Sequence, residues 1–470
     1  MRVRSAVLSS LLFGLMASCA YWTDDGQGSQ TPAAKTSNAS ADQAELPTKT
    51  APKDGPQKAP SVGAPTIRLS GSSTIGATLA PELLRAYVAH AGRDAVVKDD
   101  ERAQKRVTVA GKIAEKPFVA QVEYPGSAAA FECLLAATCD VGMSSRPITQ
   151  EELARFRTPP TEHVLAMDGI AVIVNRASRV QALSVEQIAK AFRGEINNWS
   201  QLGGAPGAIN VYGRDKLSGT FESFNQLALG GRGIAAQGAQ FMDDNDAVTD
   251  AVSKNERGIG FVGLPYVKQS KAIAVRDGDA QAQVPSTFSV QTEDYAFSRR
   301  LFFYTTDRLS TTAGDFVDFA LGDDGQKVVA QVGFVSQQVS AQAEAKAPST
   351  NAPPTYAKLT AGARRLSFDF RFRPATADLD GKAKRDLTRL AAYLGTNKGK
   401  VVLLGFADNS GDEGKNVELS RMRSQAVSME LGKLGVAADA VDGVGSALPV
   451  APNTTPEGRL KNRRVEVWVK

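Results

Sequence analysis

The sequence predicts two folded units, a larger α/β domain at about residues 64–338 and a smaller α+β domain at about residues 360–470. Within the larger unit, short strands run repeatedly into Gly/Ser/Thr loops that open helices, which is typical of α/β architecture. The smaller unit begins with a cleanly alternating strand and continues with two amphipathic helices between further strands. Two stretches poor in large apolar residues, 20–63 and 339–359, are typical of linkers, and we expect the longer one to be disordered.

The first 19 residues predict export of the chain. Arg2 and Arg4 precede an apolar run, residues 6–17, that is too short to span a bilayer. The run closes on Leu-Met-Ala-Ser-Cys19, which resembles a bacterial lipobox, and this resemblance implies cleavage before Cys19 and acylation of that cysteine. Ala20 follows where an aspartate would favour retention, so the same resemblance favours the outer membrane. The alternative is an ordinary secretory signal cut near Ala20, and either signal predicts export.

The few cysteines and histidines limit the chemistry available to the chain. With Cys19 lipidated, Cys133 and Cys139 remain in an oxidising compartment, and their short separation fits a disulfide between a helix end and the next loop. Two buried thiols are the alternative. His90 and His163 lie far from both cysteines in sequence, which disfavours a metal site. The net charge of +5 is spread without a long basic run, which disfavours nucleic-acid binding.

The loop at residues 212–220 has the composition of an anion-binding site. It connects an apolar strand to a helix, whose first turn presents unpaired N–H groups and the positive end of the helix dipole. Gly219 lets an anion approach, Ser218 and Thr220 add hydroxyl donors, and Arg214 offers a planar fork that matches a tetrahedral oxyanion. The alternative is that Ser218 simply caps the helix.

Further loops of the same hydroxyl-rich kind follow other predicted strands of this unit. One strand leads into Ser73 and Thr74, the next into Ser127, and a third into Ser145. Ligands of α/β sheets bind outside the carboxyl ends of the strands. The recurrence therefore favours one shared oxyanion site, although capping would explain each loop separately.

The order of these motifs resembles that of a phosphate ABC-transporter substrate-binding protein of the periplasmic binding protein class. The matching motifs, which cover most of residues 64–338, are Leu69–Thr74, Gly126–Ser127, Asp140–Pro147, Met167–Asn175, Ser184–Gly194, Asn198–Trp199, Arg214–Thr220 and Gly258–Phe261. The resemblance implies a two-lobe α/β periplasmic-binding-protein fold that closes over its ligand by a hinge. The anion contacts that it implies are Ser73, Thr74, Ser127, Ser145, Arg214, Ser218, Gly219 and Thr220.

Two features depart from this family pattern. Many members carry an aspartate where Ser145 stands, with no arginine after it, and that carboxylate accepts the proton of phosphate and repels sulfate. With Ser145 and Arg146 in place, this element is missing or supplied elsewhere, so oxyanion binding is better supported than phosphate specificity. The charged residues 92–116 have no counterpart in the pattern. We place His163 near the crossover between lobes and interpret it as structural, because no nucleophile-and-acid pattern surrounds it.

In the smaller unit the pattern predicts the element order βαβαβ–β, a small α+β sandwich of sheet and helices. The expected elements are strands at 366–372, 401–407, 441–445 and 465–469, with helices at 378–394 and 419–434 and a helix end at Gly435.

The polar motifs of this unit resemble those of an OmpA-like peptidoglycan-binding domain over about residues 362–470. They are Gly405–Asp408, Asn416–Arg423, Gly443–Gly445, Pro449–Ala451 and Asn453–Glu466. The resemblance implies that Asp408 holds the amine and Arg423 the carboxylate of diaminopimelate in the stem peptide, while Asn416 and Leu419 support the pocket. The alternative is a plain salt bridge between Asp408 and Arg423.

These features predict a non-enzymatic, lipid-anchored envelope protein without cofactor or metal. Its expected partners are phosphate or a similar oxyanion, peptidoglycan, the membrane through its lipid, and an ABC permease or sensor. Phosphate capture, uptake or sensing is the expected function. The alternatives are a structural or partner-binding lipoprotein that links outer membrane to cell wall, and a phosphate-ester hydrolase, for which the sequence offers neither an activated nucleophile nor metal ligands.

Overall fold

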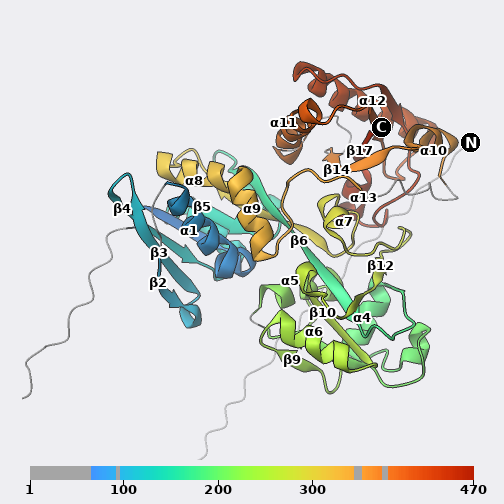
Figure 1. Cartoon of the computed structure of the whole chain (residues 1–470), viewed down its shortest axis with the longest axis horizontal. Helices are drawn as coiled ribbons and strands as arrows, with labels where there is room; N and C mark the ends of the chain where they lie inside the picture. Colours follow the sequence, from blue (N-terminus) through green and yellow to red (C-terminus); the bar gives the residue numbers. More distant parts are fainter. Residues whose placement is uncertain (1–64, 92–95, 217, 343–351, 373–378, 380) are drawn as a thin grey trace, which may run out of the picture. The chain divides into compact units, whose positions relative to one another are not determined.

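The structure, a computed structural model, describes residues 65–91, 96–216, 218–342, 352–372, 379 and 381–470. The expected signal peptide with Cys19, the linker 20–63 and residues 343–351 of the second linker lie outside these ranges. Inside them, the chain forms a larger α/β domain and a smaller α+β domain (Figure 1). None of the helices in the described ranges is long and apolar enough to cross a membrane.

One mixed sheet runs through the larger domain, with the strand order β2-β3-β4-β1-β5-β13-β6-β10-β8-β9 and with β11 beside β6. Its strands are β1 (Ile67–Gly71), β2 (Val96–Glu101), β3 (Arg106–Ile113), β4 (Lys116–Glu123), β5 (Val141–Ser144), β6 (Thr161–Val174), β8 (Asn210–Arg214), β9 (Gln240–Met242), β10 (Gly258–Gly263), β11 (Lys271–Ala272) and β13 (Ser298–Thr305). A separate pair consists of β7 (Ala182–Ser184) and β12 (Ala274–Arg276). The helices are α1 (Ala80–His90), α2 (Ala128–Leu135), α3 (Gln150–Ala154), α4 (Val185–Arg193), α5 (Gly219–Leu229), α6 (Asn245–Lys254), α7 (Thr287–Gln291), α8 (Thr311–Leu321) and α9 (Asp323–Val332).

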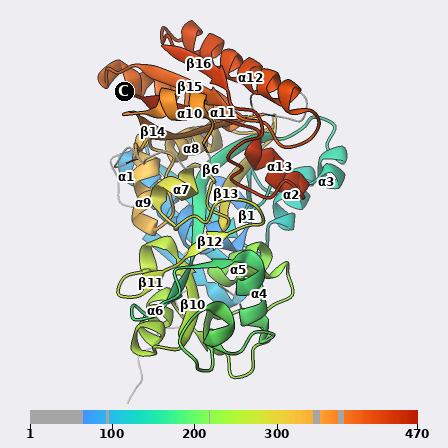
Figure 2. The ribbon, with the colours of Figure 1, turned by 90° about the vertical axis from the view of Figure 1, so that its right-hand side faces the viewer.

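The long strand β6 divides this sheet into two lobes and belongs to both. Its first part, Thr161–Gly169, pairs with β13 in the first lobe, and its last part, Ile170–Val174, pairs with β10 in the second. Figure 2 shows β6 running from the neighbourhood of β13 to that of β10. In the first lobe β1 is parallel to β4 and β5, and in the second lobe β8 is parallel to β9 and β10, so the strands of each lobe that precede the polar loops end at a common edge. The expected two-lobe fold is confirmed.

Apolar helix faces fix the helices that follow two of the polar loops. Leu79, directly before α1, and Leu83, in its first turn, are fully buried in the core of the first lobe. In the second lobe, Phe224 of α5 stacks on Phe261 of β10 with ring centroids 4.0 Å apart, and Phe192 of α4 packs against both rings. Such burial stabilises each helix by several kcal/mol, on the order of 1.5–3 per large side chain, and thereby holds its N-terminus in place.

The described part of the charged insertion, residues 96–116, extends the sheet at its edge. Strands β2 and β3 form an antiparallel pair, and β3 continues antiparallel onto β4 from Arg106↔Glu123 to Ile113↔Lys116. Val107 and Val109 are buried, because alternate residues of β3 face the core. This insertion is therefore an added β-hairpin at the end of the sheet opposite the second lobe.

Cys133 and Cys139 form a disulfide with a Cα–Cα distance of 5.3 Å. The bond ties the end of α2 to the loop that precedes β5, as expected, so the alternative of two free thiols is wrong. It lies between two elements whose ends carry candidate anion ligands.

The smaller domain is a four-stranded sheet with the order β14-β17-β15-β16. Its elements are α10 (Pro354–Thr360), β14 (Arg364–Arg371), α11 (Gly381–Thr396), β15 (Val401–Gly405), α12 (Glu413–Lys433), β16 (Ala440–Gly443), α13 (Pro456–Asn462) and β17 (Arg464–Val469). The expected order βαβαβ–β is confirmed, with the short α13 added before the last strand. Helix α12 begins at Glu413 rather than near Leu419, because its first turn is polar and is capped by the side chain of Asp412.

Both faces of this sheet are covered, which explains a helix that the sequence did not predict. In β15, Val401 and Leu403 face one core cluster, whereas Val402 and Leu404 face the other. Helix α10 covers the second face, where Tyr356 makes edge-to-face contacts with Phe406 and Trp468. The part of the expected linker nearest this domain is therefore a packed helix and not a flexible segment.

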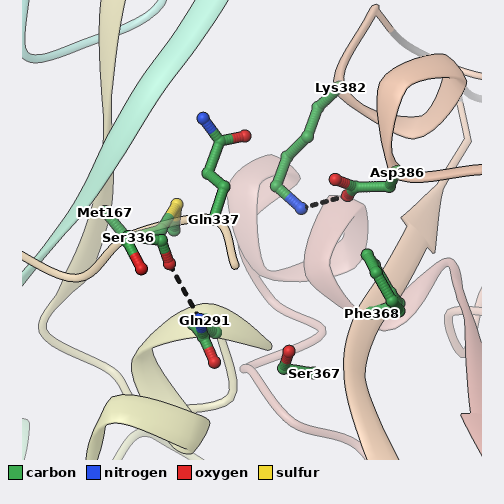
Figure 3. A pocket seen from close by; sticks show the side chains of 8 residues that line it. All are labelled: Met167, Gln291, Ser336, Gln337, Ser367, Phe368, Lys382 and Asp386. Carbon is green, nitrogen blue, oxygen red and sulfur yellow. Dashed lines mark hydrogen bonds and ion pairs between the residues drawn. The ribbon is translucent and has the colours of Figure 1, made fainter. Parts of the chain in front are cut away.

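Buried polar contacts join the first strand of the smaller domain to the segment around α7. The guanidinium of Arg365 donates to Asp294 at 2.6 Å and to Asp369 at 2.8 Å, and Arg371 donates to the carbonyl oxygen of Thr292 at 2.7 Å. Nearby lies a cavity of about 10 Å³, room for roughly one water molecule. Figure 3 shows Lys382 bonded to Asp386 on one side of it and Gln291 bonded to Ser336 on the other.

Because the pKa of His163 is lowered, we expect the protein to lose part of its folding stability in acid. Its ring lies on β6 between Thr305, with Nε2 2.9 Å from the hydroxyl, and Arg385, whose Nη1 is 3.2 Å from Nδ1. Burial first, and then the charge of Arg385, lower the pKa of His163 from 6.5 to about 4. Between pH 4 and pH 6.5 the unfolded chain therefore binds a proton at His163 that the folded chain excludes. The contribution of His163 to the free energy of unfolding is complete above about pH 6.5 and is lost as the pH falls towards 4.

We expect His163→Gln to flatten this part of the pH dependence. The measurement is the urea unfolding midpoint of both proteins at pH 7 and pH 5. An equal loss of stability in the two proteins between these pH values would contradict the assignment.

Candidate functional site

The first lobe supplies three loops at the carboxyl ends of its strands. Ser73 and Thr74 follow β1, Ser145 follows β5, and Ser127 is the residue before α2. The Oγ atoms of Ser127 and Ser145 lie 3.1 Å apart, and the backbone N–H of Ser145 donates to Ser127 Oγ at 3.1 Å. Thr74, Ser127 and Ser145 are buried, so their hydroxyls are presented within the protein and not to bulk water.

Close backbone packing holds two of these loops together. Gly71, at the end of β1, has φ +140°, and an added Cβ there would lie 1.9 Å from the carbonyl oxygen of Met143 in β5. Its own carbonyl oxygen accepts a hydrogen bond from Gly126, just before Ser127. Only glycine allows this approach, so the Gly71 position brings the loops after β1, β4 and β5 together.

The second lobe supplies Arg214 at the end of β8 and the first turn of α5. Ser218 is the N-cap of α5, and its Oγ accepts from the N–H of Phe221 at 3.0 Å. The capping interpretation of Ser218 is thus correct for its side chain, and it leaves the N–H groups of Gly219 and Thr220 at the helix start. Arg214 donates to the carbonyl oxygen of Asp243 at 2.9 Å, while its buried Nε has no hydrogen-bond partner among the described residues.

The two lobes meet where these loops face one another. An added Cβ on Gly219 would lie 2.8 Å from the Cα of Thr74, so Gly219 and Thr74 are in direct contact. One residue earlier, the hydroxyl of Ser73 donates to Glu222 of α5 at 2.7 Å. Candidate ligands from both lobes are therefore adjacent in the structure, whereas the hydrogen bonds of Arg214 lie within the second lobe.

An ion pair that the sequence did not reveal lies between the lobes. Arg299 of β13 and Asp168 of β6 are cross-strand partners, with Nε 3.2 Å from the carboxylate, and both side chains are at most 10% exposed. Arg299 also donates to the hydroxyl of Thr74 at 2.7 Å, and Asp168 accepts from Ser223 of α5 at 3.1 Å. Strands β13 and β6 are distant in sequence, and only their pairing brings Arg299 to the site. No local motif therefore predicts the position of Arg299.

Arg146 does not face the candidate site. Its guanidinium donates to both carboxylate oxygens of Glu152, at 2.8 and 2.7 Å, and this bidentate bond raises the pKa of Arg146. Glu152 is in turn part of the capping box of α3. Of the Ser145-Arg146 pair, only the serine is therefore near Ser127.

Because Gly219 is in contact with Thr74, we expect that adding a single methyl group at Gly219 impairs ligand binding. Gly219→Ala places a Cβ 2.8 Å from Thr74 Cα and 2.9 Å from its Oγ1, which forces the lobes apart. Alanine suits a helix start, so we expect unchanged folding stability and an affinity for anions lower by roughly tenfold, about 1.4 kcal/mol. The matched control is Gly395→Ala in α11, where an added Cβ meets nothing within 4 Å. Calorimetric titration checks both variants, and equal affinity in them would contradict the prediction.

A second candidate site lies in the smaller domain, after β15. Asp408 accepts from Nη1 of Arg463 at 2.8 Å and from the backbone N–H of Ser410 at 2.9 Å. Burial would raise the pKa of Asp408, but these hydrogen bonds outweigh it and hold the pKa below its ordinary value. The partner of Asp408 is thus Arg463, and the expected alternative of a plain Asp408–Arg423 salt bridge is wrong.

Helix α12 presents the other three candidate residues of this second site on one face, at spacings of three and four residues. Asn416 and Arg423 are buried, and Leu419 is half-buried. Arg423 donates weakly to the carbonyl oxygen of Phe406 at 3.4 Å and lies 5.6 Å from the ring centre of Phe372. Its Nε and Nη2 have no hydrogen-bond partner among the described residues.

A buried arginine with unused donors is costly unless a ligand satisfies it. Burial, and then repulsion from Arg463, lower the pKa of Arg423 to about 10, which indicates how poorly the charge is compensated. Asp408 and Arg423 therefore present an acceptor and a donor in one region, the pair that a free amino-acid end requires. Arg463 belongs to a motif that the sequence displays, but its pairing with Asp408 depends on β17 lying beside β15.

The chain is similar to known proteins over both domains. A profile of the PBP superfamily domain matches residues 34–324, and a profile of the OmpA family matches residues 371–463. The chain is 29% identical over 202 residues to the phosphate-binding protein PstS of Borreliella burgdorferi, which covers 42% of this chain and 71% of that protein. It is 28% identical over 258 residues to protein SphX of Synechococcus elongatus, which covers 52% of this chain and 73% of that protein.

Solved structures are similar to each domain in turn. An ABC-type phosphate transport receptor from Vibrio cholerae aligns with 57% of this chain and 99% of its own, at 25% identity and a TM-score of 0.45. The peptidoglycan-associated lipoprotein from Burkholderia pseudomallei aligns with 22% of this chain and 89% of its own, at 23% identity and a TM-score of 0.21. Because the first profile spans more than half of the sequence, the chain belongs to the PBP superfamily, and it carries a C-terminal domain of the OmpA family.

Proposed function

We propose that this chain is a non-enzymatic envelope protein that binds phosphate, or a closely related oxyanion, between its two lobes. The observation that carries the proposal is the meeting of donors from both lobes at the contact of Thr74 with Gly219. This set of donors is extended by the paired hydroxyls of Ser127 and Ser145, by the first turn of α5 and by the buried Nε of Arg214, which has no partner within the described ranges. Ser73, Ser218 and Thr220 complete the proposed ligands. The relatives named as phosphate-binding proteins support phosphate as the anion.

The smaller domain, in this proposal, anchors the protein to peptidoglycan. Asp408 takes the amine and Arg423 the carboxylate of the diaminopimelate in a stem peptide, with Asn416 and Leu419 as the wall of the pocket. Two nitrogens of Arg423 have no hydrogen-bond partner among the described residues, which supports this role because a carboxylate would satisfy them. In this proposal the oxyanion-binding domain spans about residues 64–338, and the smaller domain begins with the packed helix α10 (Pro354–Thr360) rather than at residue 360.

Lipidation of Cys19 would add a second anchor, in the outer membrane. A protein held at both ends diffuses poorly to an inner-membrane permease, so we propose local capture or sensing of phosphate rather than shuttling. A cognate permease found in complex with the protein would contradict that part of the proposal.

Calorimetric titration of the full chain, freed of bound anion, with phosphate and with sulfate at neutral pH tests the proposed function. Saturable binding of phosphate with one site per chain is the expected result. Absence of binding to either anion would refute the proposal and favour a structural lipoprotein that links outer membrane and cell wall.

A further inference from the structure

Beside the candidate anion ligands lies a carboxylate that takes part in no ion pair among the residues that the structure describes. We propose that this carboxylate, Glu222, is the group by which the site selects an oxyanion that carries a proton, such as phosphate, over a fully ionised one, such as sulfate. This inference rests on the proposed function of the cleft and assigns one of its specificity determinants. The carboxylate that distinguishes the two anions then lies in the second lobe, whereas Ser145, in the first lobe, has no carboxylate.

The position of Glu222 follows from the first turn of α5. It is two residues after Thr220, half-buried, and its Oε2 accepts the hydrogen bond from Ser73 Oγ at 2.7 Å. Ser73 precedes Thr74, which packs against Gly219. The carboxylate therefore lies between the loop after β1 and the start of α5, which are two of the proposed sources of anion ligands.

Three other carboxylates close to these loops are paired with arginine. Asp168 is bonded to Arg299 and to Ser223, Glu152 holds Arg146 in a bidentate pair, and Asp215 lies 3.5 Å from Arg214. Glu222, in contrast, takes part in no ion pair among the described residues and accepts from a neutral hydroxyl. A glutamate in the first turn of a helix also interacts favourably with the helix dipole, but that effect does not require a bond to the opposite lobe.

The chemistry of the two anions makes an unpaired carboxylate selective. Near neutral pH phosphate keeps at least one proton, and its P–O–H group can donate to a carboxylate oxygen, whereas sulfate can only repel it. Ser73 has one hydroxyl hydrogen, now donated to Glu222. When a protonated anion enters, that hydroxyl can rotate to donate to an anion oxygen while the anion's own hydrogen takes its place on Glu222. The exchange leaves no acceptor or donor unpaired, which sulfate cannot achieve.

Glu222→Gln tests this assignment, because it removes the charge and keeps the shape. Phosphate and sulfate are titrated separately into the full wild-type chain and the variant by calorimetry at pH 7. We expect the ratio of phosphate affinity to sulfate affinity to fall by at least about tenfold in Glu222→Gln, mainly because sulfate binds more tightly. The matched control is Ser73→Ala, which removes the donor and keeps the carboxylate, and which should weaken both anions by similar factors.

A second pair of anions separates protonation from size without any substitution. Arsenate keeps a proton at pH 7 and selenate does not, so the wild-type chain should prefer arsenate as it prefers phosphate. A folded Glu222→Gln protein that binds phosphate with an unchanged ratio of phosphate to sulfate affinity would overturn the assignment of Glu222 but not the proposed function. Equal affinity of the wild-type chain for arsenate and selenate would do the same. Failure of the wild-type chain to bind phosphate at all would instead refute the proposed function, and this assignment with it.

Discussion

Arg214→Ala is expected to weaken phosphate binding by at least about a hundredfold. Arg214 lies at the end of β8, just before the α5 turn, and its side chain is only 13% exposed. Two of its contacts, to Asp215 and to the carbonyl oxygen of Asp243, fix the guanidinium in place, and its Nε has no hydrogen-bond partner among the residues with described positions. A preorganised guanidinium loses little entropy on binding, and each charge-assisted bond to an anion contributes about 1.5–3 kcal/mol. Loss of two such bonds accounts for the expected factor.

Calorimetric titration with phosphate measures this effect, and Arg214→Lys is the matched variant. Lysine keeps the charge but not the planar fork, so its affinity should fall between those of the wild-type and alanine proteins. Unfolding by heat should remain cooperative in both variants, since the Arg214 side chain lies at the end of β8 and belongs to none of the described core clusters. Phosphate binding that is unchanged in Arg214→Ala would exclude Arg214 from the site.

Arg423→Leu is expected to abolish binding to peptidoglycan without destabilising the domain. Arg423 is fully buried, and its pKa is lowered to about 10, chiefly by burial. Since two of its nitrogens have no partner among the described residues, an apolar side chain of comparable volume should leave the free energy of unfolding unchanged or raise it by up to about 2 kcal/mol. Function and stability thus move in opposite directions at this residue.

Sedimentation with purified sacculi measures wall binding, and denaturant unfolding measures stability. The control is Arg421→Ala on the same helix, where the side chain is 43% exposed and paired with Asp442 and Glu418. That variant should sediment like the wild-type protein. A loss of stability by several kcal/mol in Arg423→Leu would show that the buried arginine supports the fold and not a ligand.

Local patterns predicted the strand–loop–helix units that hold the candidate residues of both domains, because each of these polar loops follows an apolar strand and precedes a helix. The hydroxyl-rich loops at Ser73, Ser127, Ser145 and Ser218 were found in this way, and the lobes indeed bring Thr74 against Gly219. The roles of these residues remain proposals. What local patterns do predict is which loops lie at the carboxyl ends of the strands.

Contacts between distant segments were not predictable from such patterns. Arg299 reaches Asp168 only because β13 returns to pair with β6, and Arg463 reaches Asp408 only because β17 lies beside β15. Helix α10 lies in a Pro-rich stretch that has the composition of a linker. It covers the second face of the sheet with Tyr356, which only the arrangement of the sheet determines. These contacts depend on the register of the strands and on which face of a sheet is left exposed. A local sequence motif predicts neither of these properties.

We propose that one protein molecule binds phosphate while it is bound to the cell wall. Sacculi incubated with the full chain and labelled phosphate, then sedimented, test it directly. We expect label to sediment in proportion to protein, to be lost in Arg214→Ala while the protein still sediments, and to be lost together with the protein in Arg423→Leu. Wild-type protein that sediments with the sacculi but carries no phosphate would contradict the account.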